Sequence, residues 1–209
     1  MGKRLQYTLV LGVIAMVTSV GVGATYVLTK DKIARKEAAR RMEALLTVMP
    51  GLAGDPVQIT PPETPAEDNV YKGQGADGSV VGYAALGKAQ GYSSTLKVMV
   101  GLSPDKDTIL GIKVLYQAET PGLGTRIVEV ATTKTLWTMI FGDEKASVTE
   151  EVSLTPWFCD QFKAKTLNQL EVVRKEDSSR ITAITGATIT TRAVVKAVKD
   201  AIAKIKGAS

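Results

Sequence analysis

The chain opens with an apolar run long enough to cross a lipid bilayer. No charged residue occurs between Leu5 and Thr29, and the apolar core over residues 7–28 is 22 residues long, against the roughly 20 that a membrane-spanning helix needs. Tyr7 and Tyr26 stand near its ends, where aromatic rings favour the membrane interface. A cleaved signal peptide is the alternative, but its apolar segment has only about 7–15 residues. The pattern therefore predicts a retained transmembrane helix within residues 1–29.

Residues 30–69 are predicted to form a juxtamembrane helix followed by an irregular linker. Apolar positions from Ile33 to Leu46 recur every three or four residues in a segment rich in helix formers. This spacing favours a helix over residues 30–48 that continues the membrane helix and ends at Pro50-Gly51. The proline-rich residues 51–69 show little periodicity. A charged helix of this kind is most often a solvated stalk, and a specific lipid or partner site is the alternative.

Residues 70–209 have the pattern of an α+β domain. Short β-leaning stretches occur at 79–86, 96–100 and 109–116, and the last two flank the turn-rich residues 103–107, which predicts a hairpin. Strands in consecutive runs with helices interspersed late favour an antiparallel sheet with flanking helices over a doubly wound sheet. The later expected elements are helices at Thr132–Phe141 and Trp157–Leu170, strands at Leu170–Val173 and Ile181–Ile184, and a final helix capped by Thr190 or Thr191.

The net charge of +5 is concentrated at the N-terminal end of the chain. Residues 3–41 hold eight of the 26 basic residues but only two of the 21 acidic ones. The remainder is close to neutral, so no basic stripe marks the predicted domain as a binder of duplex nucleic acid. Six of the eight basic residues follow the apolar run. By the positive-inside rule this bias favours a cytoplasmic location for the domain.

Two absences in composition narrow the chemistry. The chain has no histidine, which excludes Ser-His triads and imidazole ligands to a metal. It has one cysteine, Cys159, so no disulfide, CxxC redox pair or Cys-ligated iron–sulfur cluster can form within the chain. Cys159 is expected to be a buried small apolar residue. Redox work by this chain would therefore require an organic cofactor.

Two polar, glycine-containing segments are candidate binding loops. The first, residues 119–124 (Glu-Thr-Pro-Gly-Leu-Gly), follows the predicted hairpin, and its glycines allow close backbone approach to a flat ring or a phosphate. The second, residues 182–190, gathers threonines where the final helix is expected to begin, and a helix N-terminus suits a phosphate. A tight turn and an ordinary threonine-rich cap are the alternatives that composition alone favours.

The two segments together resemble the signature sequences of a known FMN-binding domain family. Thr185-Gly-Ala-Thr188, with Thr190 shortly after it, is similar to the flavin-attachment pattern of the G subunit of Rnf ion-translocating electron-transport complexes, and residues 119–124 resemble the family's upstream loop. The family also includes the C subunit of sodium-pumping NADH:quinone reductases. The stretches at 91–94 and 157–162 extend the likeness, which with the N-terminal span covers nearly the whole chain.

The resemblance implies a cofactor and its contacts. FMN would be joined through its phosphate to the hydroxyl of Thr188, in a reaction performed by a separate flavin transferase acting on FAD. The transferase's preferred pattern has an acidic residue three positions before the first threonine of the motif, where this chain has Thr182. The expected ring contacts are Glu119, Thr120, Leu123 and Gly124, and the expected phosphate contacts are Thr185, Gly186 and Ala187.

The implied function is electron transfer inside a membrane complex. The chain, not catalytic alone, would carry electrons with other membrane subunits of an Rnf-type complex that couples ferredoxin–NAD electron transfer to ion movement. The family places this domain on the outer face of the cytoplasmic membrane, against the charge bias above, and we follow the family. Two alternatives stay open: the C subunit of a sodium-pumping quinone reductase, and a membrane-tethered scaffold without a cofactor.

Overall fold

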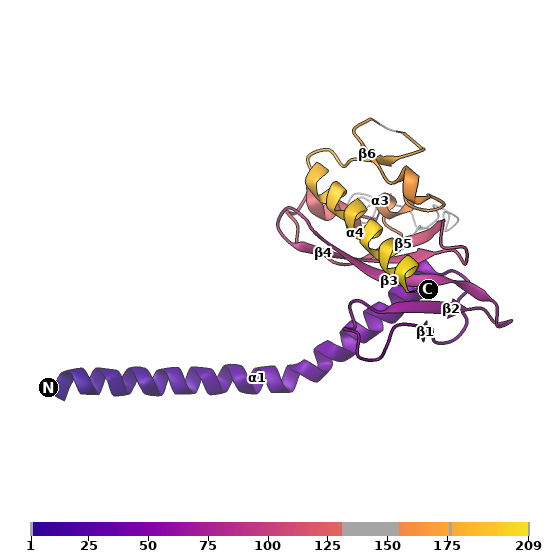
Figure 1. Ribbon diagram of the computed structural model, residues 1–209. Helices are drawn as coiled ribbons and strands as arrows, with labels where there is room; N and C mark the ends of the chain where they lie inside the picture. The colour runs from indigo at the N-terminus through magenta and orange to yellow at the C-terminus, as the bar shows by residue number, and fades with distance from the viewer. Residues whose placement is uncertain (1, 131–154, 176, 209) are drawn as a thin grey trace, which may run out of the picture. The chain divides into compact units, whose positions relative to one another are not determined.

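The computed structural model describes residues 2–130, 155–175 and 177–208. The chain forms two compact units, residues 1–42 and 43–209. The second unit holds an antiparallel sheet with helices, so the α+β class predicted from the sequence is confirmed (Figure 1). The helix expected at Thr132–Phe141 lies outside the described residues.

Helix α1 (Gly2–Val48) is continuous across the predicted transmembrane and juxtamembrane segments. Within the described ranges it is the one helix long and apolar enough to cross a membrane, and no part of its apolar stretch is buried inside the protein. The hydroxyls of Thr8, Thr18 and Thr25 donate to carbonyls four residues earlier at 2.8–3.0 Å. Such internal pairing satisfies polar groups that a bilayer interior cannot. The helix ends just before Pro50-Gly51, as predicted.

A five-stranded antiparallel meander forms the centre of the second unit. Its strands pair in chain order. The register of β3 (Val80–Gln90) with β4 (Thr95–Leu102) is unbroken from Tyr83↔Leu102 to Gln90↔Thr95. The hairpin predicted around residues 96–116 is confirmed as β4 and β5. The strands are β1 (Val57–Gln58), β2 (Val70–Gln74), β3 (Val80–Gln90), β4 (Thr95–Leu102) and β5 (Ile109–Tyr116).

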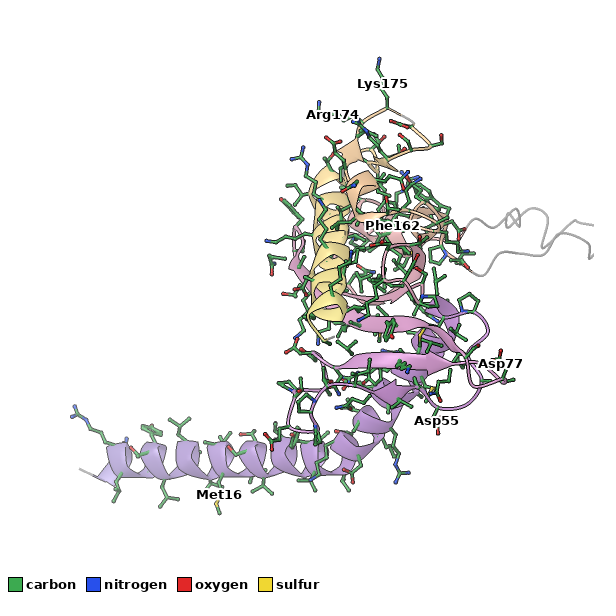
Figure 2. The ribbon with its side chains drawn as sticks, turned by 45° about the vertical axis from the view of Figure 1, so that its right-hand side comes forward. Met16, Asp55, Asp77, Phe162, Arg174 and Lys175 are labelled. Carbon is green, nitrogen blue, oxygen red and sulfur yellow. The ribbon has the colours of Figure 1, made fainter. Side chains whose placement is uncertain are left out.

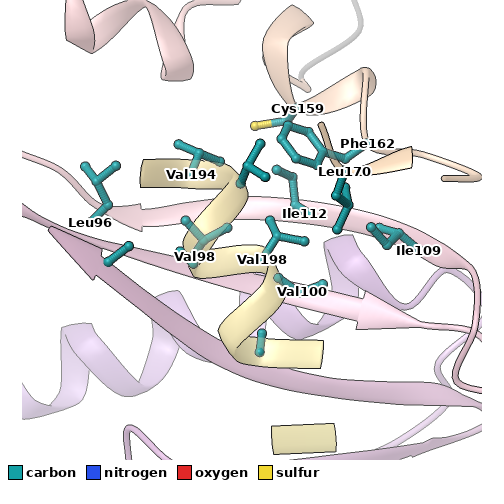
Figure 3. Close-up of a cluster of buried hydrophobic side chains, with 14 of the residues drawn as sticks. Leu96, Val98, Val100, Ile109, Ile112, Cys159, Phe162, Leu170, Val194 and Val198 are labelled. Carbon is teal, nitrogen blue, oxygen red and sulfur yellow. The ribbon is translucent and has the colours of Figure 1, made fainter. Parts of the chain in front are cut away.

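One face of the sheet packs against helix α4 (Thr188–Gly207). Alternate residues of β4 point to this face, as the period of a strand requires, and Figure 3 shows Val98 and Val100 in one cluster with the helix residues Val194 and Val198. Gly87 lies where α4 crosses β3, and a Cβ there would overlap the carbonyl oxygen of Ala197. The helix backbone therefore rests directly on the sheet.

The other face is covered by the end of α1. Ala44, Leu45 and Val48 pack with Met99 in a second apolar cluster, and a Cβ at Gly101 would overlap the carbonyl oxygen of Val48. The sheet thus lies between the last helix of the chain and the last turns of the first.

Two predicted features of the C-terminal third are wrong in detail. Helix α3 spans only Trp157–Asp160, because the backbone of 164–165 hydrogen-bonds to Ile109 at 2.8 and 2.9 Å and leaves the helical path there. A 3₁₀ turn, η2 (Leu167–Gln169), follows. Helix α4 begins at Thr188, and its N-cap is Ala187, without a side-chain cap. Neither Thr190 nor Thr191 caps it, because both lie inside the helix, as its third and fourth residues.

Short strands were expected at residues 170–173 and 181–184, and both occur. β6 (Val172–Val173) and β7 (Ile181–Thr182) pair in parallel as a separate two-stranded sheet. Between α3 and the main sheet, Cys159 is buried beside Phe158 and Phe162. Burial raises the pKa of the Cys159 thiol to about 12. It behaves as a small core residue, as predicted.

Candidate functional site

The structure brings the two candidate loops together around one cavity. The cavity has a volume of about 530 Å³, within the usual range of roughly 300–1,000 Å³ for ligand pockets. Seven of the eight predicted cofactor contacts line it, and Thr185 is exposed outside the lining. The lining residues are Tyr92, Glu119, Thr120, Leu123, Gly124, Gly186, Ala187, Thr188, Ile189 and Thr190.

The loops adopt conformations that their glycines allow. Gly122 and Gly186 have φ values of 75° and 80°, a region that side chains with a Cβ rarely occupy. After Gly122 the chain enters a 3₁₀ turn, η1 (Gly124–Val128). A Cβ on Gly186 would lie 3.0 Å from a methyl of Leu123. The two loops are therefore in direct contact where they line the cavity.

The buried carboxylate of Glu119 ties three segments together. It accepts hydrogen bonds from the amides of Tyr92, Ser93 and Ser94 at 3.0–3.1 Å and from the Ser94 hydroxyl at 3.1 Å. It also accepts one from the Thr190 hydroxyl in the first turn of α4, at 2.6 Å. The post-β5 loop, the 91–94 turn and the start of α4 are thereby held in one arrangement, which we call the Glu119 clamp.

Both oxygens of the Glu119 carboxylate accept hydrogen bonds within the clamp. The side chain is only 5% exposed. Burial by itself raises the pKa of Glu119, but the hydrogen bonds from Thr190 and from the amides of residues 92–94 outweigh it, and the net pKa is lower than usual. The carboxylate is therefore ionised at neutral pH and points into the clamp.

Gly124 is required by the same contacts. A Cβ at this position would lie 2.6 Å from Cβ of Glu119 and 2.9 Å from the Thr190 hydroxyl oxygen. Because a contact under 3 Å between such atoms forces one of them to move, any side chain at 124 would displace the clamp. The second glycine of the 119–124 loop is therefore required by close packing at the clamp, and not only by the backbone freedom that a glycine allows.

The three threonines of the attachment motif have different surroundings. Thr190 is buried and its hydroxyl donates to Glu119, and Thr185 is exposed. Thr188 is half-buried, lines the cavity and is the first residue of α4. The first amides of a helix have no acceptor within it, and no side chain among the described residues caps α4. An anion beside Thr188 would therefore meet unpaired amides and the positive end of the helix dipole.

The residues of the cavity fit FMN. Tyr92, Leu123 and Ile189 are 69%, 45% and 56% exposed, and large apolar side chains left exposed at a cavity suit a flat aromatic ring. The helix start suits the phosphate. The Glu119 carboxylate, the one acidic group of the lining, is turned into the clamp.

Sequence reasoning missed Ile189 as a cavity residue and the clamp as a whole. Tyr92 was noted only as part of a resemblance, and Thr190 as a cap or as the residue that follows the motif. The donors to Glu119 are 25–27 and 71 positions away along the chain. A buried glutamate in a loop gives no local sequence signal of such partners.

Comparison with known proteins places the chain in a family. The model of the FMN-binding domain matches residues 91–203, and that of the RnfG N-terminal region matches residues 4–48. The G subunit of the ion-translocating oxidoreductase complex of Haemophilus influenzae (strain PittEE) is 32% identical, over 93% of this chain and 86% of that protein. The corresponding proteins of Vibrio atlanticus and Methanosarcina acetivorans are 33% and 28% identical, over 93% and 91% of this chain and 86% and 88% of theirs.

Two solved structures are more distant. NqrC of Shewanella oneidensis is 23% identical with a TM-score of 0.43, over 66% of this chain and 61% of that one. The C subunit of the Na⁺-translocating NADH-quinone reductase of Parabacteroides distasonis is 21% identical with a TM-score of 0.44, over 67% of this chain and 61% of its own. Both likenesses span less than two thirds of the solved chains.

These matches define the class first: a protein with an FMN-binding domain behind an apolar N-terminal helix. Within that class, the chain belongs to the RnfG family, the G subunits of ion-translocating oxidoreductase complexes that its motifs resemble.

Proposed function

We propose that this chain is the FMN-carrying electron-transfer subunit of an Rnf-type membrane complex that couples ferredoxin–NAD electron transfer to ion translocation. The observation that carries the proposal is the meeting of the 119–124 and 186–190 segments around one cavity, with Thr188 at the start of a long helix. The family and the exposed apolar part of α1 support membership of a membrane complex. When bound, FMN would accept and release one or two electrons.

The attachment site that we propose is the hydroxyl of Thr188. With no histidine in the chain, nothing near it can serve as an imidazole base, and a threonine hydroxyl is a weak nucleophile. A separate flavin transferase would therefore be needed to join FMN to the Thr188 hydroxyl. In that transfer a bond would form between the Thr188 oxygen and the phosphorus of the FMN half of FAD. The phosphoanhydride bond of FAD would break with AMP as the leaving group, and the hydroxyl proton would pass to solvent.

The other residues of the cavity would hold and position the cofactor. Gly186, Ala187 and the first amides of α4 are suited to the phosphate, and Leu123 with Thr120 and Gly124 to the ring. Thr185, exposed outside the cavity lining, is suited at most to the outer side of the phosphate. Glu119 would act by holding Thr190 and the 91–94 turn in place.

Covalent flavin is tested by electrophoresis under denaturing conditions. The full chain, expressed with and without a flavin transferase, is run beside a known transferase substrate, and flavin fluorescence is read in the gel. A fluorescent band that requires the transferase is the expected result. If the band stays dark while the control substrate fluoresces, the chain is not a carrier of covalent FMN, and the electron-carrier proposal loses its main support.

The domain is proposed to face the outer side of the cytoplasmic membrane, because a tethered cofactor is not lost by dilution there. The lone Cys159 is buried, so an introduced cysteine can be labelled almost without background. We expect Ser178→Cys, at an exposed position, to react in intact cells with a membrane-impermeant maleimide. The matched variant Gly2→Cys, before the span, should react only after lysis. The opposite pattern would place the domain inside, as the basic residues after the span favour.

A further inference from the structure

Helix α4 carries three exposed cations on one side, and they line a second hollow. Its volume is about 410 Å³, and it lies between α4 and the β6 strand. Its lining combines the three cations with apolar side chains, which form the floor of the hollow. We call this site the basic hollow; its lining residues are Leu170, Glu171, Val172, Arg192, Val195, Lys196 and Lys199.

These cations differ from the others on the same helix. Near its C-terminal end, Lys204 pairs with Asp68 at 2.9 Å and with Asp200 at 3.1 Å, and Lys206 pairs with Asp107 at 2.9 Å. Arg192, Lys196 and Lys199 form no salt bridge with any residue that the structure describes. The acidic residue of the hollow, Glu171, is 65% exposed and pairs with Arg180 at 3.1 Å.

The position of the cations along α4 is unfavourable for the helix itself. Arg192 and Lys196 are four residues apart, and Lys196 and Lys199 are three apart, so like charges are neighbours on the helix surface. Pairs of like charge at this spacing destabilise a helix. Arg174 and Lys175, which follow β6, add exposed positive charge at the same end of the domain (Figure 2). This concentration of charge does not serve stability, and an anionic partner would neutralise it.

The hollow lies next to the proposed cofactor site. Thr188, Arg192, Val195 and Lys199 follow one another at spacings of four, three and four residues, so they share one face of α4. At 1.5 Å per residue, Arg192 is roughly 6 Å along the helix axis from Thr188. A partner seated on the cations would therefore lie beside the cofactor attachment position.

We propose that the basic hollow docks an acidic segment of a partner protein, which its apolar floor and elongated row of cations favour over a free anion. The role of that partner as one that exchanges electrons with the flavin rests on the proposed function, whereas the docking itself does not. Electron-transfer contacts are small and are guided by complementary charge. The row spans Arg192 to Lys199, about 10 Å of helix, and Val172 and Val195 lie in its floor. These features suit a segment in which acidic and apolar residues alternate.

The test measures binding of a fluorescein-labelled peptide of alternating glutamate and leucine to the full chain in neutral detergent, by fluorescence anisotropy at low salt. The hollow variant combines Arg192→Gln, Lys196→Gln and Lys199→Gln. The matched control combines Lys113→Gln, Lys163→Gln and Lys206→Gln, which removes the same charge from cations already paired elsewhere on the domain. We expect the hollow variant to bind about tenfold more weakly and the control to bind like the wild type.

Equal weakening in both triple variants would overturn the proposal, because the peptide would then respond to net charge alone. A lipid occupant is distinguished by repeating the assay in nanodiscs of phosphatidylcholine with and without phosphatidylglycerol. Loss of peptide binding in the anionic discs would replace the protein segment with a lipid headgroup. In-gel flavin fluorescence is read on the same samples. Selective peptide binding with a dark flavin band would keep the docking site and remove its electron-transfer role.

Discussion

Thr188→Ala is expected to remove all covalently bound flavin, the largest effect that we foresee for one substitution in this chain. The three threonines of the motif are not equivalent: Thr190 is buried and committed to Glu119, and Thr185 is exposed outside the cavity lining. Thr188 lines the cavity at the first position of α4, and its hydroxyl is not committed to Glu119 as that of Thr190 is. The measurement is in-gel flavin fluorescence after co-expression with a transferase.

Thr188→Ser is the matched control for this experiment. Serine keeps the hydroxyl at the same position and removes only a methyl group, so the serine variant should remain fluorescent while the alanine variant is dark. Urea unfolding of the alanine variant should match the wild type within about 0.5 kcal/mol, as for most half-exposed substitutions. A fluorescent alanine variant would contradict the assignment and direct the search to the exposed hydroxyl of Thr185.

Glu119→Ala is expected to lower the free energy of unfolding by about 3 kcal/mol or more. The substitution leaves the amides of residues 92–94 and the hydroxyl of Thr190 without their acceptor. Hydrogen bonds to a charged group are worth roughly 1.5–3 kcal/mol each, and stranded donors add a cost. The measurement is urea unfolding of the full chain in neutral detergent, followed by tryptophan fluorescence.

An exposed carboxylate provides the control for Glu119. Glu129 is 56% exposed and pairs with Arg126 at 3.2 Å, and removing such a pair changes stability by less than about 1 kcal/mol. Glu129→Ala should therefore unfold close to the wild type. If Glu119→Ala does so as well, the clamp does not hold the three segments together.

The clamp also predicts a pH dependence. The pKa of Glu119 is lowered in the folded chain, from an ordinary value of 4.5. A lowered pKa means that the stabilisation is complete above about pH 4.5 and is lost as the pH falls through the folded-state value. The stability difference between the wild type and Glu119→Gln should therefore be constant near neutrality and shrink on acidification. Comparing the two cancels the contribution of Glu67, whose pKa is lowered to about 2 by Lys88 and Lys97.

The parts of the fold that local patterns determine could be predicted from the sequence. The hairpin of β4 and β5 follows from alternating apolar residues on either side of a turn, and α1 from continuous apolar and helix-forming residues. The helix expected over Trp157–Leu170 was wrong because its second half pairs with the backbone of Ile109, some 55 positions earlier. Helical spacing in the sequence carries no information about that strand edge.

The candidate site follows the same division. Glycines and threonines marked both segments as candidate loops, since those residue types have local conformational meaning. The resemblance to the family's motifs, and not composition alone, favoured a binding role for them. The cavity they form, and the use of Glu119 as a clamp, depend on which distant segments meet. The cap assignment for Thr190 was wrong because α4 begins two residues earlier, and the Thr190 hydroxyl bonds to the buried carboxylate of Glu119.

The last turns of α1 pack on one face of the sheet, and this contact determines where the chain can be truncated at its N-terminal end. Removing the membrane segment by starting at residue 50 would also remove Ala44, Leu45 and Val48, and would expose Leu86 and Met99 on the bare face. A water-soluble fragment for crystallography or potentiometry would therefore have to begin at or before Glu43, whose carboxylate also meets Lys113 at 2.8 Å. During biosynthesis the same contact means that the domain cannot complete its second apolar layer until the end of its own anchor helix has docked.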